Sequence, residues 1–183
     1  MAQRNVQPLR TQEEINEMKW ALQRFGIERD RFLFIFGINV GLRISDIVPL
    51  KVSDVKDAKH VTIREKKTKK VKRFYLNAKL REDIDNYIST LKNDSYLFPS
   101  RKQGFHISTV QAYRILTNAG KMLDRDDIGT HTLRKTFGYH HYKKNKDVAT
   151  LQTLFNHSNP KVTLKYIGIT DDEVEATLSD FYL

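Results

Sequence analysis

The segment from residue 28 to residue 41 constrains the fold more than any other part of the sequence. It reads ERDRFLFIFGINVG, and apolar side chains occupy nearly every face of the helix that it would form. A helix that is apolar all round has to be buried, because any exposed face would leave apolar surface in water. The sequence therefore predicts a central helix covered by other elements. In a chain of 183 residues, this indicates a single domain with a substantial core.

Helix signals continue on both sides of this segment. Thr11 and Glu14 have the spacing of a capping box, in which each side chain bonds the backbone N–H of the other. The helix that they begin carries its apolar face on Ile15, Met18, Leu22 and Phe25. Asn77 is a preferred N-cap, and Asn159-Pro160 joins a cap to the residue best suited to a first helical turn. We expect further helices at 45–50, 77–91, 108–123, 132–145, 147–156, 160–167 and 171–180, with Tyr113, Leu116 and Leu123 as core positions of the 108–123 helix.

One stretch has a β pattern instead. Residues 60–64 (HVTIR) and 71–76 (VKRFYL) are rich in β-branched and aromatic side chains and flank the lysine-rich segment 65–70. This arrangement predicts an antiparallel β-hairpin with a basic tip. The predicted fold class is therefore mainly α with a small antiparallel β-hairpin (α+β). Residues 1–10 are expected to form an N-terminal tail or linker, and residues 171–183 a C-terminal helix or tail.

The charge of the chain indicates a polyanionic partner. Thirty-two Lys and Arg residues against 22 Asp and Glu residues give a net charge of +10. Seven of the ten residues from Arg64 to Arg73 are basic. Such an excess suits DNA, RNA or an anionic membrane surface, although a charge run alone is more commonly a solvated surface. No RNA-recognition signature accompanies it, which disfavours an RNA-binding protein.

Several classes of protein can be set aside from the sequence. No apolar run approaches the roughly 18 residues that a membrane-spanning helix needs, and residues 1–10 have no apolar core of the kind found in a secretory signal. The lack of cysteine excludes disulfides and thiolate chemistry and fits a cytoplasmic protein. The six histidines form no HExxH pair, and there is no phosphate-binding glycine loop. We therefore expect no metal and no cofactor.

An ordered set of short motifs carries the functional signal. It begins with Gly41–Asp46 (GLRISD) and continues with Lys67-Thr68, His131–Arg134 (HTLR), Leu154–Ser158 (LFNHS) and Tyr166, nine residues after the last histidine. At these residues the sequence resembles the tyrosine recombinase (phage integrase) family. That family has a GLR-x-[SGT]-[DE] box, a hairpin lysine, H-x-L-R, LGHSS and a nucleophilic tyrosine about nine residues further on. Five motifs in the right order over residues 11–168 are a specific match.

The chain departs from the family pattern at four positions. Asn156 stands where the LGHSS glycine would be, and Asn159 replaces the second serine of that motif. Gly168 lies two residues after the tyrosine, where many members have histidine, and Lys69 follows Lys67-Thr68 where glycine is common. None of these changes replaces a side chain with an expected catalytic role. The hairpin also contains Lys66, Lys69 and Lys70, which are alternative candidates for the role of Lys67.

The resemblance implies a role for each side chain, and the chemistry agrees with it. Transfer of a phosphodiester passes through a phosphorane with added negative charge, which two guanidinium groups can clamp because each is planar and permanently charged. Arg43 and Arg134 are the candidates. Tyr166 would be the nucleophile, and it needs help to lose its proton because a free phenol has a pKa of about 10. His131, three residues before Arg134, could accept that proton.

The remaining roles follow from the same resemblance. His157 is expected to hydrogen-bond a phosphate oxygen, and Lys67 to protonate the leaving 5′-oxygen, its pKa being lowered by neighbouring cations. Asp46 would orient Arg43 or cap a helix. The plainer interpretations are an Arg43–Asp46 salt bridge, a core tyrosine at Tyr166 and a simple phosphate contact at Lys67. Further DNA contacts are expected from Arg64, Lys66, Lys69, Lys70, Lys72, Arg73 and Lys135.

The resemblance also implies an activity. The chain is expected to be a site-specific recombinase or integrase that cleaves and rejoins DNA strands through a covalent 3′-phosphotyrosine, without metal or ATP. Its partner would be double-stranded DNA, on which four copies assemble while free copies associate weakly or stay monomeric. Residues 171–183 are candidates for docking onto a neighbouring copy. The alternatives are a type IB-like topoisomerase and a non-catalytic DNA-binding regulator of the same fold.

Overall fold

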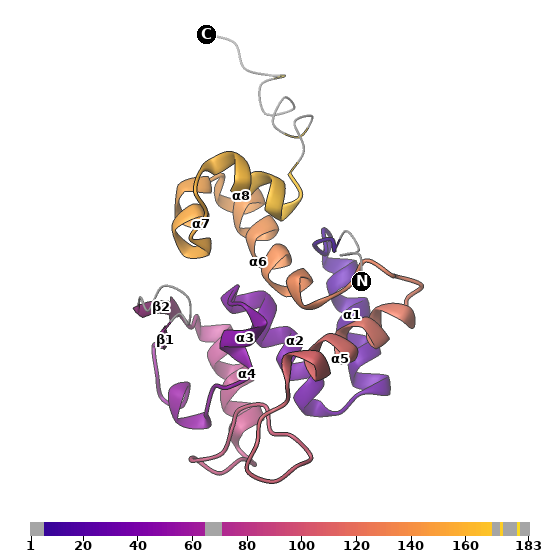
Figure 1. The fold of residues 1–183 in the computed structure, drawn as a ribbon, viewed down its shortest axis with the longest axis vertical. Coiled ribbons are helices and arrows are strands. Elements are labelled where there is room, and N and C mark those ends of the chain that lie inside the picture. The colour runs from indigo at the N-terminus through magenta and orange to yellow at the C-terminus, as the bar shows by residue number, and fades with distance from the viewer. Residues whose placement is uncertain (1–5, 65–70, 170–172, 174–178, 180–183) are drawn as a thin grey trace.

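Helices make up most of the chain (Figure 1). The computed structural model describes residues 6–64, 71–169, 173 and 179. The helices are α1 (Gln12–Phe25), α2 (Glu28–Val40), α3 (Ile44–Ile47), α4 (Ala78–Ile88), α5 (Thr109–Lys121), α6 (Thr130–Asn145), α7 (Val148–Phe155) and α8 (Pro160–Ile167), with a short 3-10 turn at Val52–Asp54. The strands β1 (His60–Arg64) and β2 (Val71–Tyr75) pair antiparallel. The predicted fold class, mainly α with a small antiparallel hairpin, is confirmed.

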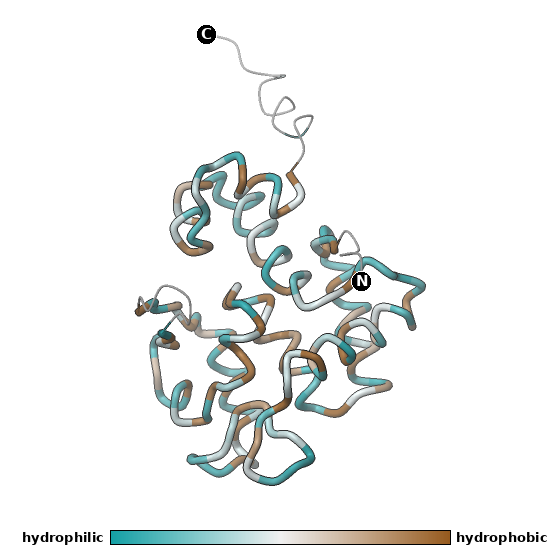
Figure 2. Tube along the Cα trace, viewed as in Figure 1, coloured by the Kyte–Doolittle hydropathy of each residue, from teal (hydrophilic) through white to brown (hydrophobic). Residues whose placement is uncertain are grey.

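The central helix is α2, as its sequence requires. Phe32, Leu33, Phe34 and Phe36 are at most 2% exposed, although they point to different sides of the helix. Helices α1, α4, α5 and α6 all pack against it. Gly37 lets α6 approach closely, because a Cβ there would lie 2.6 Å from Leu133 Cδ1. Figure 2 shows hydrophobic and hydrophilic residues alternating along most helices, as expected for helices with one buried face.

A second, smaller core lies between α6, α7 and α8. Tyr139, Leu151, Phe155, Ile167 and Ile169 form it. These three helices gather at one end of the molecule, and most of the other elements lie at the opposite end (Figure 1). Their packing is tight, since a Cβ on Gly138 of α6 would lie 2.6 Å from Ile167 Cγ2 of α8. Helix α8 is therefore packed closely against α6 and α7.

The two strands of the hairpin have one buried and one exposed face. Val61 pairs with Phe74 and Ile63 with Lys72, and these four residues share the inner face. Arg64 and Arg73 lie on the outer face, where their side chains are exposed. The lysine-rich tip at 65–70, which contains Lys66, Lys67, Lys69 and Lys70, is outside the described residues.

Residues 6–10, which we call the N-terminal strap, lie across α6. We expected this stretch to be a tail or linker, yet Leu9 is 0% exposed. The Leu9 N–H donates to Thr136 Oγ1 at 2.9 Å, and the Leu9 carbonyl lies 2.9 Å from His140 Nε2. The Gln7 N–H donates to the Asp127 carbonyl at 3.0 Å. The strap is thus held along its length by bonds to residues far away in the chain.

The predictions of helix caps agree with the structure better than the predictions of which side chains are buried. The capping box of Thr11 and Glu14 and the cap at Asn77 are both present. Two core predictions were wrong: Phe25 is 57% exposed and Tyr113 is 48% exposed. The buried stripe of α5 runs through Ala112, Leu116 and Ala119, and Tyr113 lies beside it. The helix expected at 171–180 falls almost wholly outside the described residues.

Candidate active site

The site begins where the central helix ends. Gly41 terminates α2 in the left-handed conformation, with φ 63° and ψ 19°. A Cβ at Gly41 would lie 2.3 Å from Phe137 Cδ1, so this turn needs glycine for space as well as for conformation. Two residues later Arg43 takes the N-cap position of α3, and its side chain is exposed. The turn therefore presents Arg43 at the surface directly after a buried helix.

Arg134 is held in place from several sides. The residue is only 4% exposed. Its guanidinium donates to the Gly41 carbonyl at 2.7 Å and to the Phe155 carbonyl at 3.0 Å. The same group lies 4.1 Å from the centre of the Phe155 ring, within the range of a cation–π contact. A charge this well anchored is pre-organised to meet an anion without further rearrangement.

Tyr166 projects from α8 toward Arg134 and His131. Its hydroxyl lies 3.1 Å from His131 Nδ1, and against the effect of burial the charge of Arg134 acts to lower its pKa. The Tyr166 ring meets Phe155 edge to face at 5.7 Å and His157 at 5.0 Å. The hydroxyl therefore lies beside a base and is influenced by the charge of a neighbouring cation.

His157 follows the turn that ends α7. Asn156 makes this turn in the left-handed conformation, with φ 55° and ψ 47°. Asparagine is one of the few residues with a side chain that tolerate this conformation, which explains how it replaces the glycine of the LGHSS motif. Beyond the turn, His157 Nδ1 lies 3.2 Å from Thr163 Oγ1 on α8. The histidine is thus oriented by the helix that carries Tyr166.

The electrostatics of the site keep both histidines neutral. Desolvation lowers the pKa of His131, and the charges of Lys135, Arg134 and Arg43 lower it further. The pKa of His157 is lowered by desolvation and then by Arg134, Arg43 and Lys72. Arg43 thus acts on both imidazoles across the site. A neutral imidazole can accept a proton, which a charged one cannot.

Burial raises the pKa of the Tyr166 phenol above its ordinary value. The charges of Arg134 and Arg43 and the hydrogen bond from Arg134 act in the opposite direction. The phenol is therefore protonated at neutral pH. A phenol in this state could act as a nucleophile only with a base beside it, and His131 Nδ1 lies within hydrogen-bonding distance of the hydroxyl.

The hairpin contacts α7 through Lys72. This side chain donates to the carbonyls of Leu154 at 3.0 Å and Thr153 at 3.4 Å, in the last turn of α7. We expected Lys72 to contact DNA, and the structure places it on the inner face of the hairpin beside the motif that contains His157. Arg73, on the outer face, lies 3.2 Å from His60 Nδ1. The side chain of Lys67 falls outside the described part of the chain.

Lys135 and Asp46 lie at the edge of the site. Lys135 Nζ donates to the Val6 carbonyl of the N-terminal strap at 2.6 Å and is 5.4 Å from the centre of the Tyr166 ring. Desolvation lowers the pKa of this lysine. Asp46 is half-buried in the first turn of α3, and its N–H donates to the Arg43 carbonyl at 2.8 Å.

The structure brings most of the predicted residues together. Arg134, His131, His157 and Tyr166 form one cluster, and Arg43 is near enough to shift the pKa of the other titratable members. Sequence reasoning missed the supporting residues, among them Phe155, Thr163 and the Gly41 carbonyl. Phe155 and Gly41 lay inside recognised motifs, but nothing in the sequence marks them as partners of Arg134.

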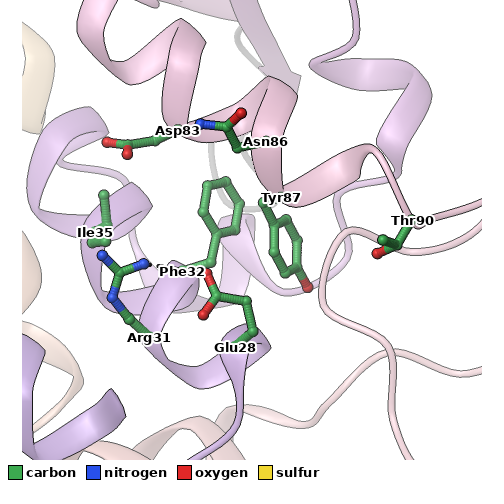
Figure 3. A pocket seen from close by; sticks show the side chains of 8 residues that line it. All are labelled: Glu28, Arg31, Phe32, Ile35, Asp83, Asn86, Tyr87 and Thr90. Atoms are coloured by element: carbon green, nitrogen blue, oxygen red, sulfur yellow. Dashed lines mark hydrogen bonds and ion pairs between the residues drawn. The ribbon is translucent and has the colours of Figure 1, made fainter.

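Away from this cluster, the described residues form hollows, but they provide no metal-binding cluster and no helix that could span a membrane. A hollow between α2 and α4 is lined by Glu28, Arg31, Phe32 and Tyr87 among others (Figure 3). The Phe32 and Tyr87 rings stack there at 4.0 Å, and among the described residues no predicted site residue lines it. Over those same residues, no cluster of three or more His, Asp or Glu side chains could hold a metal ion. Nor does any helix in the described ranges have the length and apolar character to cross a bilayer.

Comparison with known sequences gives one family. The model of the phage integrase family matches residues 10–173. The chain is 48% identical over 176 residues to a protein named "Probable integrase/recombinase YoeC" from Bacillus subtilis (strain 168), covering 96% of this chain and 97% of that protein. It is 29% identical over 164 residues to the tyrosine recombinase XerA of Pyrococcus furiosus, covering 87% of this chain and 57% of that protein. The chain thus spans little more than half of this second relative.

Comparison with solved structures gives the same fold. A XerA recombinase superposes with a TM-score of 0.77 at 19% identity, covering 96% of this chain and 67% of that one. A XerH site-specific recombinase, bound to its palindromic difH substrate in a post-cleavage complex, superposes with a TM-score of 0.76 at 20% identity. That match covers 94% of this chain and 52% of the other.

Proposed function

The chain belongs to the phage integrase family of tyrosine recombinases, and we propose that it cleaves and rejoins double-stranded DNA through a covalent bond between Tyr166 and a 3′-phosphate. One observation carries this proposal: the Tyr166 hydroxyl lies 3.1 Å from His131 Nδ1, and against the effect of burial the charge of Arg134 acts to lower the pKa of the same hydroxyl. A core tyrosine would need only one partner for its hydroxyl. Here the partners are a neutral base and an anchored cation, the two groups that phosphoryl transfer requires.

The first half of the reaction transfers the phosphoryl group to the enzyme. Tyr166 Oη attacks phosphorus, and its proton passes to His131 Nδ1. Arg43 and Arg134 bind the non-bridging oxygens as their negative charge grows, and His157 donates a hydrogen bond to one of them. The bond to the 5′-oxygen breaks, and Lys67 gives that oxygen a proton. The products are a 3′-phosphotyrosine and a free 5′-hydroxyl.

The second half reverses the first with a different nucleophile. A 5′-hydroxyl from another strand attacks the phosphorus and gives its proton to Lys67, which the first half left neutral, and the Tyr166 oxygen leaves with the proton held on His131. The ester to Tyr166 conserves the energy of the broken phosphodiester bond, so the reaction needs no ATP, and the cationic side chains would stabilise the phosphorane in place of a metal ion. Exchange between two duplexes needs a nucleophile at each of four strands, which we propose four copies of this chain supply on the DNA.

A nicked duplex tests the cleavage step. Such a substrate loses a short fragment after cleavage, and the enzyme stays attached to the DNA. The duplex should carry sequences that the chain itself selects from a random pool. We expect a covalent protein–DNA band that persists in EDTA, is lost in Tyr166→Phe and is kept in the matched variant Tyr142→Phe. A DNA shift with no covalent band from the wild-type chain would contradict the proposal and favour a non-catalytic DNA-binding module.

The role of Lys67 can be tested separately. A duplex with sulfur at the 5′-bridging position has a thiolate leaving group, which needs no general acid because the pKa of a thiol is only about 8.5. We expect Lys67→Ala to cleave the ordinary duplex slowly and the sulfur duplex at nearly the wild-type rate. Equal slowing on both substrates would assign proton donation to another group.

A further inference from the structure

The N-terminal strap reaches the helix that carries Tyr166. Arg10 Nη2 donates to the Gly168 carbonyl at 2.8 Å, two residues after the tyrosine. The Arg10 guanidinium also lies 5.2 Å from the centre of the Tyr139 ring, and its Nη1 is 3.5 Å from a Glu173 carboxylate oxygen. Its backbone N–H donates to Glu14 at 2.5 Å. Arg10 therefore joins α1, α6 and the end of α8.

The glycine at position 168 fits this contact closely. Gly168 ends α8 with φ 79° and ψ 27°, a left-handed conformation. A Cβ at this position would lie 3.1 Å from Arg10 Nη2 and 3.4 Å from the ring of Pro8. The strap packs where a side chain would otherwise stand. Many family members have histidine two residues after the tyrosine, and the packing of the strap gives a structural reason for glycine at this position in this chain.

The strap also reaches the tyrosine from a second direction. Its Val6 carbonyl accepts a hydrogen bond from Lys135, whose Nζ lies 5.4 Å from the centre of the Tyr166 ring. Helix α8 is only eight residues long, and its last carbonyls need partners from outside the helix. The Gly168 carbonyl lies at the C-cap just beyond α8, and its bond from Arg10 ties the end of the helix to the N-terminal strap.

We propose that Arg10 is a positioning residue for Tyr166: its bond to the Gly168 carbonyl holds α8 so that the tyrosine hydroxyl stays beside His131 and Arg134. This inference rests on the proposed strand cleavage by Tyr166. Arg10 touches neither the reacting atoms nor the DNA in this mechanism, so its replacement changes the rate of attack and leaves DNA affinity alone. Because a misplacement of about 1 Å can cost roughly 100-fold in rate, loss of this bond should slow attack by about 10- to 100-fold.

The experiment compares Arg10→Ala with Arg10→Lys and Arg24→Ala. Arg24 is an exposed residue in the last turn of α1, so its variant controls for the loss of one positive charge. Covalent adduct formation is followed with enzyme in excess over a nicked duplex, alongside DNA affinity and thermal unfolding. We expect Arg10→Ala to form the adduct slowly while its DNA affinity is unchanged. The rate of adduct formation should be intermediate in Arg10→Lys and equal to the wild-type rate in Arg24→Ala. Added guanidinium ion, at concentrations far below those that unfold proteins, should speed up Arg10→Ala alone.

The sulfur-containing duplex distinguishes attack from leaving-group departure. The Arg10→Ala defect should persist on it, because a better leaving group does not reposition the nucleophile. Recovery of the wild-type cleavage rate by Arg10→Ala on the sulfur-containing duplex would overturn the proposal. So would an Arg10→Ala rate equal to the wild-type rate, or a rate loss matched by an equal loss of DNA affinity.

A second readout does not depend on catalysis. The chain labelled with 3-fluorotyrosine gives a ¹⁹F resonance for Tyr166, identified by its absence in Tyr166→Phe. We expect this resonance to shift or broaden in Arg10→Ala and to stay in place in Arg24→Ala. If the wild-type chain forms no adduct but the resonance moves, the proposed function fails and the positioning contact stands. If the adduct forms and the resonance does not move, the positioning contact is the part that fails.

Discussion

At the scale of single residues, the site depends on backbone positions as much as on reactive side chains. Arg134 is anchored by the carbonyls of Gly41 and Phe155, and both residues adjoin a left-handed turn. Those turns end α2 and α7 and place Arg43 and His157 just beyond them. A substitution at a turn can therefore affect the site without removing any side chain that takes part in the chemistry.

Asn156 offers a test of this dependence. Its side chain is exposed, so replacing it removes little packing, but its backbone is left-handed at φ 55°. Alanine in that conformation costs about 1–2 kcal/mol, whereas glycine adopts it freely. We expect urea unfolding to show Asn156→Ala less stable than Asn156→Gly by about 1 kcal/mol. Equal stability of the two variants would mean that the turn relaxes and carries no strain.

The lowered histidine pKa values predict a loss of stability in acid. In the folded chain His131 and His157 resist protonation because of desolvation and the neighbouring cations. In the unfolded chain they protonate near the ordinary pKa of about 6.5. As the pH falls through that value the unfolded state binds more protons, so the free energy of unfolding decreases until the folded pKa values are reached.

The measurement is urea unfolding at pH 7.5 and pH 5.5. The wild-type chain should lose stability between these two conditions, and the double variant His131→Asn, His157→Asn should lose less. The other four histidines and the carboxylates are common to both proteins and cancel in the comparison. An identical decrease in the two proteins would contradict the assigned pKa directions.

At the scale of elements, the site forms where separate units meet. The turn after α2 provides Arg43, and α6 provides His131 and Arg134. His157 comes from the turn after α7, and Tyr166 comes from α8. The hairpin joins them because Lys72 bonds the last carbonyls of α7. Lys72 and Arg73 are neighbours in one strand, yet they point to opposite faces and should have different roles.

Replacing each of these two residues with methionine should separate the roles. Lys72→Met keeps an apolar stem but loses the bonds to α7, so we expect slower adduct formation with little change in DNA affinity. Arg73→Met removes an outward charge. If Arg73 contacts a phosphate, its loss should weaken binding and reduce the slope of log affinity against log salt by about 1. The opposite pattern, with Lys72→Met weakening binding and Arg73→Met slowing cleavage, would refute this assignment.

At the scale of the whole molecule, charge should dominate DNA binding. The net charge is +10, and Arg64 and Arg73 lie exposed on the outer face of the hairpin. Lys and Arg contacts with phosphates release counterions, which makes binding steeply dependent on salt. We therefore expect charge to bring DNA to the molecule, where the anchored cluster around Tyr166 would act on one phosphate.

We expect this chain alone to bind unselected duplex DNA weakly. Non-specific phosphate contacts typically give dissociation constants of about 1–100 μM at physiological salt. The logarithm of the affinity should fall linearly with the logarithm of the salt concentration, with a slope of about 0.9 per phosphate neutralised. Fluorescence anisotropy of a labelled duplex between low and physiological salt measures this slope. Nanomolar binding that does not change with salt would show that the chain makes extensive contacts of another kind.

The sequence alone was enough to predict the helices of the described residues, the two strands of the hairpin and the family. Capping boxes, apolar periodicity and ordered motifs are local signals, and each depends on residues a few positions apart. The cap at Asn77 and the buried helix at Glu28–Val40 were predicted this way and are present. The roles of Arg43, Lys67, His131, Arg134, His157 and Tyr166 were also proposed from the sequence and stay predictions until the variants are tested.

Only the tertiary structure decided how the site is supported. Arg134 bonds a carbonyl 93 residues away in the chain, and Arg10 bonds one 158 residues away. Whether Lys72 points inward or outward depended on the register of the hairpin and on the position of α7. Such pairings arise when helices pack and bring distant backbone groups together. A one-dimensional pattern contains no signal for them, because the partner is an ordinary carbonyl that every residue has.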